Sequence, residues 1–388
     1  MKNESNNYFF REGINVLSLF DGMSCGQIAL ERCGIKVNNY FASEIDKHAI
    51  KVTQHNYPQT KQIGSVIDVK AIDLPKIDLL YGGSPCQGFS FSGKQLNFED
   101  PRSKLFFEFV RLVKEIKPTY WMLENVKMKK EYQDVISEYL GVEPVKINSS
   151  LVSAQNRNRL YWCNFNINQP QDKMIVLKDI VEDGLTSLGL AQRGRYENDK
   201  IVQKYKLNGK EKSNTLTTVA KDTLLFIPVD KHSSNNGLVC LGGVMKPTHK
   251  LWLNDGKLLQ RNFSQGNRVY SESGKSTTLN ANSGGVGGKT GLYEIEGVIR
   301  KLTRVECERL QTVNDNYTES VSNTQGIKML GNGWTVDVIV DIFNQMLLKK
   351  AKSVGFFLLR MNKIKLIKCT DIALAANTQI RHTPITNS

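Results

Sequence analysis

The sequence predicts an α/β fold, a doubly wound mixed sheet of the Rossmann-like type joined to a smaller domain. Short β-rich runs alternate with helical patterns from residue 14 to about residue 165, as they do in such sheets. Two of these runs, residues 14–20 and 77–81, lead directly into turns of small residues. From residue 183 to about residue 298, Gly, Ser, Asn and Thr dominate and helical periodicity is poor, which indicates a mostly β or irregular domain.

Each element of the first domain is expected from its local pattern. Strands are expected at residues 14–20, 37–43, 77–81, 120–123 and 161–165. Helices are expected at residues 27–33, 46–55, 103–116, 303–311 and 335–350. The first helix ends before Gly34, a residue type that is favoured just after a helix. The third helix carries an apolar face at helical spacing.

The chain divides into five segments. They are an N-terminal extension (1–12), a first domain (13–182), a second domain (183–298), a return to the first domain (299–350) and a tail (351–388). The tail holds six Lys or Arg and one acid, Asp371, and we expect it to be a poorly ordered tail or an appended segment. Residues 212–217 resemble residues 275–280, and chance similarity explains this echo as well as a structural repeat does.

Composition and charge exclude several classes of protein. The 388 residues include 52 Lys or Arg and 38 Asp or Glu, which gives a net charge of +14 and favours a polyanionic partner. No run approaches the ~20 apolar residues that span a bilayer, so we expect no membrane segment. Residues 1–10 lack the apolar core of a secretion signal, and the seven cysteines include no CxxC pair. We therefore expect a cytoplasmic protein without disulfides or a metal site.

Cys86 is the residue most indicative of function. It lies in a Gly-, Pro- and Ser-rich stretch, residues 82–90, directly after an expected strand. A lone cysteine is more often a buried structural thiol. Here the composition indicates a surface loop at the carboxyl end of a strand, where α/β sheets bind their ligands. Since Pro85 fixes the approach of the chain, we expect Cys86 to act as a nucleophile.

Two further groups of polar residues adjoin expected strands. Glu124 and Asn125 follow one strand and should reach the same sheet edge as Cys86, where a carboxyl group can serve as acid or base. Gln155, Arg157 and Arg159 alternate before another strand, so their side chains should share one face. Two fixed guanidinium groups suit phosphate or carbonyl recognition, although a solvated basic edge is an equally good interpretation of this segment alone.

The turn after the first strand predicts a ligand that contains adenosine. It contains Phe20, Asp21, Gly22 and Gly26, and the small residues of this turn let a ligand approach the backbone and the start of the next helix. Glu44 ends the second strand, about twenty residues on, where an acid can bind ribose hydroxyls. The glycine fingerprint of nicotinamide enzymes is absent. These residues do not distinguish a dinucleotide from S-adenosylmethionine.

Taken together, these residues resemble the DNA (cytosine-5) methyltransferase family. Six blocks occur in the family order: residues 20–26, Glu44 with Asp46, residues 83–90, residues 124–126, residues 155–159 and residues 331–333. The resemblance covers about residues 13–180 and 298–350. It implies the S-adenosylmethionine-dependent methyltransferase fold, with the second domain recognising the target sequence.

The resemblance also implies a chemical mechanism. Cys86 would attack carbon 6 of a cytosine flipped out of double-stranded DNA. Glu124 would assist at ring nitrogen 3, Asn125 would orient that edge, and Arg159 would hold the carbonyl oxygen of the base. The candidate catalytic residues are Cys86, Glu124, Asn125, Gln155, Arg157 and Arg159.

Cofactor and DNA contacts are implied in the same way, for a chain expected to be monomeric. The S-adenosylmethionine contacts would be Phe20, Asp21, Gly22, Gly26, Glu44, Ile45, Ser65, Pro85, Leu105, Asn332 and Gly333. Ser65 stands where the family usually has an acid. The DNA contacts would be Gln87, Ser90, Ser92, Arg102, Arg261, Arg268, Gly284 and Gly285. A tRNA methyltransferase and a non-catalytic DNA-binding relative are the alternatives. The recognition sequence, and a restriction–modification, phage or orphan role, stay open.

Overall fold

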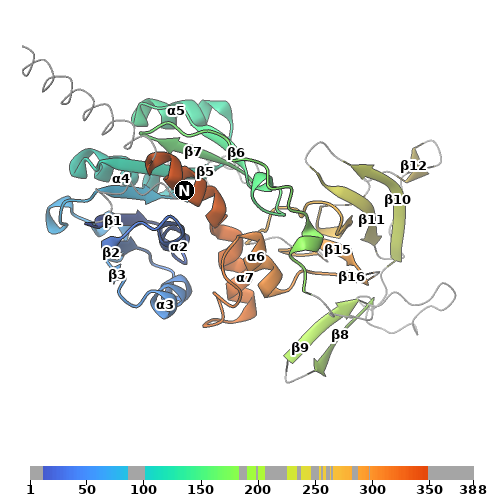
Figure 1. Cartoon of the computed structure of the whole chain (residues 1–388). Helices are drawn as coiled ribbons and strands as arrows, with labels where there is room; N and C mark the ends of the chain where they lie inside the picture. The colour runs from blue at the N-terminus through green and yellow to red at the C-terminus, as the bar shows by residue number, and fades with distance from the viewer. Residues whose placement is uncertain are drawn as a thin grey trace, which may run out of the picture.

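The computed structural model places an α/β unit beside a β-rich unit (Figure 1). It describes residues 12–85, 101–182, 190–197, 200–205, 225–233, 237–245, 253–254, 257–258, 263, 265–281, 287–296 and 298–347. The expected tail at residues 351–388 and most of the expected N-terminal extension lie outside these residues.

A seven-stranded mixed sheet forms the centre of the α/β unit. Its strands are β1 Ile14–Leu19, β2 Val37–Ser43, β3 Lys61–Gln62, β4 Leu79–Gly82, β5 Tyr120–Val126, β6 Val145–Asn148 and β7 Asn158–Cys163, in the order β3-β2-β1-β4-β5-β7-β6. Neighbours from β3 to β5 are parallel, whereas β7 runs antiparallel to β5 and β6. The predicted doubly wound mixed sheet is confirmed.

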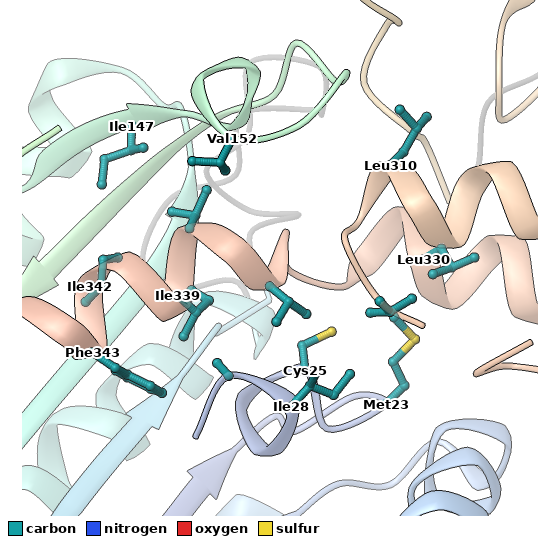
Figure 2. Close-up of a cluster of buried hydrophobic side chains, with 14 of the residues drawn as sticks. Met23, Cys25, Ile28, Ile147, Val152, Leu310, Leu330, Ile339, Ile342 and Phe343 are labelled. Carbon is teal, nitrogen blue, oxygen red and sulfur yellow. The ribbon is translucent and has the colours of Figure 1, made fainter. Parts of the chain in front are cut away.

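Helices cover both faces of this sheet. They are α2 Cys25–Arg32, α3 Lys47–Asn56, α4 Pro101–Ile116, α5 Lys130–Leu140 and a helix at residues 336–347. Two further helices, α6 Arg304–Leu310 and α7 Asn323–Asn332, lie between this sheet and the β-rich unit (Figure 1). Alternate residues of a strand face opposite sides, so Val16 and Leu17 belong to two separate apolar clusters. Ile28 of α2 and Phe343 belong to the first cluster (Figure 2), and Phe109 of α4 belongs to the second.

The strand order fixes where a ligand can bind. From β1 the chain moves outward to β2 and β3, and it then returns to place β4 on the other side of β1. Ligands of open α/β sheets bind beyond the carboxyl ends of the strands at such a switch point. Here that point is the turn after β1 together with the loop after β4.

The β-rich unit contains a five-stranded sheet in the order β10-β11-β14-β15-β16. Its strands are β10 Leu225–Ser233, β11 Val239–Met245, β14 Arg268–Ser271, β15 Leu292–Ile295 and β16 Val298–Arg300. Two small pairs accompany it: β8 Leu190–Glu197 with β9 Lys200–Tyr205, and β12 Leu253–Asn254 with β13 Lys257–Leu258. Strand β16 crosses the expected domain limit at residue 298, and the exact limits stay a prediction.

Several elements differ from those expected. The pattern did not single out α5, β6 or α7. Strand β5 continues through Glu124 and Asn125, which were expected in the following loop, and β7 begins three residues before its expected start at residue 161. Both β5 and β7 are interior strands with polar residues at one end. The hydrophobic pattern therefore marks only the apolar part of each.

Residues 275–280 connect the two units. Ser276 and the segment before β7 exchange backbone hydrogen bonds, since the N–H of Ser276 donates to the Ala154 carbonyl (2.8 Å) and the N–H of Asn156 donates to the Ser276 carbonyl (3.0 Å). The Lys275 ammonium group donates to the carbonyls of Ser150 (2.9 Å) and Ile175. Residues 275–280, which resemble residues 212–217 in sequence, therefore help to join the β-rich unit to the central sheet.

A second polar contact joins the chain just before the β-rich unit, at Glu182, to the chain at the end of that unit, at Arg300. The Arg300 guanidinium donates to both carboxylate oxygens of Glu306, each at 2.7 Å, and the Glu306 side chain is fully buried. The same carboxylate accepts the backbone N–H of Glu182 (3.0 Å) and that of Thr303 (2.8 Å). This one carboxylate thus holds the outgoing and the returning chain together.

We expect Lys275→Met to destabilise the protein by about 1.5–3 kcal/mol, because the carbonyls that accept from a charged donor lose their partner. Urea unfolding of the two proteins measures this difference. Lys178→Met is the matched control, because Lys178 is an exposed lysine whose backbone N–H donates to the carbonyl of Glu272, three residues before Lys275. Equal unfolding free energies for the two variants would contradict this assignment of Lys275.

Candidate functional site

The turn after β1 is shaped to expose its backbone. Phe20 and Gly22 have positive φ angles of 57° and 60°, and no atom lies within 4 Å of where a Gly22 side chain would begin. The Gly22 N–H donates to Oε2 of Glu44 (2.8 Å), and Oε1 of Glu44 accepts the N–H groups of Ile45 (2.7 Å) and Asp46 (2.8 Å). Glu44 therefore ties the carboxyl end of β1 to that of β2.

Asp21 and Gly26, expected to contact a cofactor, support this turn from within the protein. The Tyr40 hydroxyl donates to Oδ1 of Asp21 (2.6 Å), and the Ser24 hydroxyl bonds to Oδ2. The Tyr40 hydroxyl also lies 2.8 Å from that of Tyr81. A side chain at position 26 would begin 2.2 Å from the Tyr81 oxygen, so only glycine leaves room for this pair. Burial raises the pKa of Asp21 to about 6.

Two exposed isoleucines follow the neighbouring strands. Ile45 comes after β2 and is 77% exposed, and Ile67 comes shortly after β3 and is 63% exposed. Ser65 caps the short helix that contains Ile67, because its hydroxyl accepts the Ile67 N–H (3.4 Å). Ile67 was not expected from the sequence, although an apolar residue so soon after a Gly-Ser turn was a usable signal. Together these side chains offer apolar surface beside the turn after β1.

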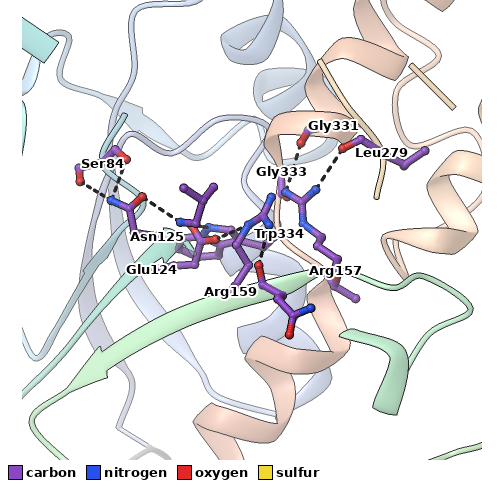
Figure 3. A network of polar contacts seen from close by, with 12 residues as sticks. Ser84, Glu124, Asn125, Arg157, Arg159, Leu279, Gly331, Gly333 and Trp334 are labelled. Carbon is purple, nitrogen blue, oxygen red and sulfur yellow. Dashed lines mark hydrogen bonds and ion pairs between the residues drawn. The ribbon is translucent and has the colours of Figure 1, made fainter. Parts of the chain in front are cut away.

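Glu124 is held by one donor on each carboxylate oxygen (Figure 3). Nε of Arg159 lies 3.0 Å from Oε1 of Glu124, and Nε1 of Trp334 donates to Oε2 at 3.1 Å. The side chains of Arg159 and Glu124 are 14% and 10% exposed, so water shields the pair little and their attraction is strong. Trp334 carried no signal in the sequence, apart from its place directly after the Gly-Asn-Gly block.

Asn125 anchors the loop that leads to Cys86. Its Nδ2 donates to the Ser84 hydroxyl (3.2 Å) and to the Ser84 carbonyl (3.4 Å), while its Oδ1 accepts the Val126 N–H (2.8 Å). The chain is therefore fixed two residues before Cys86. The next residues, including Cys86, Gln87, Ser90 and Ser92, lie outside the described part of the chain.

Arg157 was expected to bind phosphate or a carbonyl oxygen of a ligand, but it binds the protein's own backbone. Its guanidinium donates to three carbonyls of the protein itself, those of Leu279 (3.3 Å), Gly331 (3.2 Å) and Gly333 (2.8 Å). The residue is 2% exposed. Burial, with Arg159 nearby, lowers its pKa to about 9, so it remains a cation at neutral pH. Arg157 is thus a buried clamp rather than a group offered to phosphate or to a base.

Gln155, Arg157 and Arg159 consequently do not share one face. Strand β7 begins only at Asn158, so the alternation of an extended strand does not reach back to residue 155. Gln155 is fully buried in a bridge to Ser276. Of the three, Arg159 alone contacts Glu124.

The Gly-Asn-Gly block lies at the end of α7 and packs against the second unit. A side chain at Gly331 would begin 2.7 Å from the backbone nitrogen of Ala281, so this approach requires glycine. Asn332 is exposed, Gly333 caps the helix, and Leu105 and Pro85 are half-buried. The roles of Asn332, Gly333, Leu105 and Pro85 toward a cofactor stay predictions.

Few of the expected DNA contacts fall on described side chains. Nε of Arg268 donates to the Phe263 carbonyl (3.0 Å) at the start of β14. Arg261, Gly284 and Gly285 lie outside the described residues, as does the side chain of Arg102.

The cysteines described by the structure form no disulfide with one another and are buried or half-buried: Cys25, Cys33, Cys163, Cys240 and Cys307. Burial raises the pKa of Cys25 and of Cys33 to about 12, and it also raises the pKa values of Cys163 and Cys307. A thiol with so high a pKa carries almost no thiolate at neutral pH. Within the described residues, no three His, Cys, Asp or Glu side chains gather as they would around a metal, and no helix is long and apolar enough to cross a membrane.

Comparison with known proteins gives consistent results. The family described as C-5 cytosine-specific DNA methylase matches residues 14–348. The orphan methyltransferase M.Rho11sI of Bacillus phage rho11s is 33% identical in an alignment of 321 positions that covers 74% of this chain and 61% of that relative. The type II methyltransferase M.HhaI of Haemophilus parahaemolyticus is 29% identical over 334 residues, 84% of this chain and 92% of the relative.

Solved structures share the fold at lower identity. A mutant of Spodoptera frugiperda DNMT2 has a TM-score of 0.56 at 15% identity and covers 87% of this chain and 100% of its own. The Entamoeba histolytica methyltransferase EhMeth has a TM-score of 0.56 at 15% identity and covers 87% and 98%. The chain spans less than two thirds of the phage relative but nearly all of M.HhaI.

We expect Arg157→Met to lower the free energy of unfolding by about 3 kcal/mol or more, because three buried carbonyls lose a charged donor. Arg159→Met removes a side chain that donates to one backbone carbonyl, that of Asn158, where Arg157 donates to three, and it should cost clearly less. Chemical unfolding of both variants measures the difference. Equal costs would show that Arg157 is not the buried clamp that its contacts indicate.

Asp21 should make stability depend on pH. Its carboxyl binds a proton more tightly in the folded chain, with a pKa of about 6 against 3.8 for the free side chain. The folded state therefore loses about 3 kcal/mol from this group as pH rises from about 3 to about 7, and the loss persists at higher pH.

Asp21→Asn removes this titration and keeps an acceptor for Tyr40. Relative to the original protein, the variant should gain stability at pH 8 and differ little at pH 4. Urea unfolding at both pH values tests this, and a stability difference that does not change with pH would refute it.

Proposed function

The chain belongs to the C-5 cytosine-specific DNA methylase family, and from this we propose that it transfers a methyl group from S-adenosylmethionine to carbon 5 of cytosine in double-stranded DNA. The net charge of +14 supports a nucleic-acid substrate. Carbon 5 of cytosine is a weak nucleophile, so the enzyme must activate the ring before the methyl group can move.

Activation proceeds through Cys86. Its thiolate bonds to carbon 6, and the electrons of the carbon 5–carbon 6 double bond move so that carbon 5 becomes nucleophilic. Carbon 5 then takes the methyl group as the bond between that methyl carbon and the sulfonium sulfur breaks, which leaves a neutral thioether. A base removes the carbon 5 proton, the carbon–sulfur bond breaks, and the double bond re-forms as the thiolate leaves. Since the ring edge is inaccessible in a duplex, the base must first leave the stack, at a cost of a few kcal/mol.

The observation that carries this proposal is the position of the Glu124 carboxylate. Strand β5 lies beside β4, and Leu123 is the register partner of Gly82. Glu124 therefore lies next to the start of the loop that leads to Cys86, and its hydrogen bonds fix it there. At ring nitrogen 3, a carboxyl group would stabilise the negative charge that the thiolate brings, which is worth about 10²–10⁴-fold in rate.

Four other cysteines are less suited than Cys86 to act as the nucleophile. Burial raises the pKa values of Cys25, Cys33, Cys163 and Cys307, so these thiols are poor nucleophiles. Asn125 stabilises the loop before Cys86 through Ser84. Arg159, next to Glu124, is placed to hold the carbonyl oxygen of the same base.

The turn after β1 fits S-adenosylmethionine. The space above Gly22 is open, and two exposed apolar side chains, Ile45 and Ile67, follow the neighbouring strands. Glu44 accepts the backbone N–H groups of Gly22 and Ile45, at the end of β2 where an acid binds ribose hydroxyls. When bound, this group supplies a methyl carbon made electrophilic by its sulfonium. Phe20, Gly22, Glu44 and Ile45 would hold it, and the β-rich unit would contact the DNA.

We expect Cys86→Ala to abolish methyl transfer while DNA binding persists, because phosphate contacts do not need the thiol. Cys33→Ala is the matched control and should retain activity. Transfer of tritium from S-adenosylmethionine to DNA of mixed sequence measures turnover, and a gel-shift assay measures binding. Methylation that survives in Cys86→Ala would exclude this nucleophile.

The substrate is tested with the same assay. Label in the cytosine of duplex DNA is the expected result. If folded protein labels no nucleic acid, the proposed function is refuted. If it labels tRNA and not DNA, tRNA is the substrate. Bisulfite sequencing of the treated DNA would then give the recognition sequence.

A further inference from the structure

The indole of Trp334 contacts the catalytic carboxylate that we propose, although it lies 210 residues away in the sequence. Its Nε1 donates to Oε2 of Glu124 at 3.1 Å, on the side opposite Arg159 (Figure 3). A carboxylate has about four lone-pair sites. Arg159 and Trp334 use two of them, so sites remain for the ring of a base while both protein contacts persist.

The indole is itself fixed on three sides. Its ring meets that of Tyr81 edge-on, with centroids 5.6 Å apart and planes at 62°. The backbone carbonyl directly before it, that of Gly333, accepts from Arg157. The third side is Gly83, where an added side chain would begin 3.1 Å from Nε1 of Trp334 and 3.0 Å from Oε2 of Glu124. Glycine there leaves the hydrogen bond undisturbed.

We propose that Trp334 is a positioning residue for Glu124: its indole N–H holds one carboxylate oxygen while Arg159 holds the other, so that the carboxyl plane is set before cytosine enters. This rests on the proposed role of Glu124. A carboxylate held at one oxygen can rotate about its last torsion, which is a soft one. Two donors from opposite sides stop that rotation, and catalysis is sensitive to misplacements of about 1 Å.

Trp334→Phe tests the proposal, because it keeps an aromatic ring against Tyr81 and removes the N–H. We expect kcat to fall by about 10- to 100-fold, while KM for S-adenosylmethionine and for DNA changes less than about threefold. Trp162→Phe is the matched control, since the Trp162 Nε1 donates to the Ser137 hydroxyl, also at 3.1 Å, in the other apolar cluster. It should affect stability and leave kcat unchanged.

Three outcomes would overturn the proposal. One is a raised KM for S-adenosylmethionine with kcat unchanged, which would make Trp334 a wall of the cofactor site. Another is no change in any kinetic constant. The third is an equal loss of kcat in Trp162→Phe and Trp334→Phe, which would indicate a purely structural role.

Gly83→Ala gives a second test that does not depend on Trp334→Phe folding. The added methyl group would separate the indole from the carboxylate without altering either, so kcat should again fall with KM unchanged. Normal kcat in this variant would contradict the proposal.

A spectroscopic measurement separates this inference from the proposed function. The chain has four tryptophans, and the indole N–H signal of Trp334 is assigned by its absence in Trp334→Phe. In ¹⁵N-tryptophan-labelled protein, Glu124→Gln should shift that signal and leave the Trp162 signal in place. An unshifted Trp334 signal would refute the contact, whereas a shifted signal in a protein without methylation activity would refute only the proposed function.

Discussion

The buried guanidinium of Arg157 is the contact on which the arrangement of the site depends. It joins three segments that are distant in sequence, because it stands just before β7 and binds the carbonyls of Leu279 in the second unit and of Gly331 and Gly333 at the end of α7. A buried cation without partners is costly, so these segments must meet at one point. The peptide before Trp334 is fixed there, and with it the donor to Glu124.

The hydrophobic pattern predicted the central sheet well and its polar ends poorly. Residues 37–43 were expected as a strand and form β2 with the same limits, because apolar positions dominate that run. Glu124 and Asn125 were assigned to a loop, although they continue β5 to Val126. A polar residue inside a strand resembles a loop residue unless its partner is known. Here the partners are Arg159 and Ser84, 35 and 41 positions away.

Dependence on distant partners also explains why the sequence predicted the same role for Arg157 and Arg159. Both are arginines two positions apart in a polar segment, and no property of the local sequence separates them. What separates them is long-range: one meets carbonyls more than 120 positions away, and the other meets a carboxylate on the adjacent strand. Trp334 was missed for this reason as well, since its hydrogen bond spans 210 positions. Motif spacing located the residues of the site, and only the fold assigned their separate tasks.

The pairing of Glu124 with Arg159 is itself an argument for function. Removing two charges from water costs several kcal/mol per ion, and packed apolar side chains of similar volume often stabilise a fold as well or better. A pair this little exposed at the ends of two central strands therefore serves stability poorly. It suits chemistry, because donors and acceptors that are already desolvated and oriented need little reorganisation when charge develops on a bound ring. The indole of Trp334 adds a neutral donor to this arrangement, which restrains the carboxylate without adding a second buried cation.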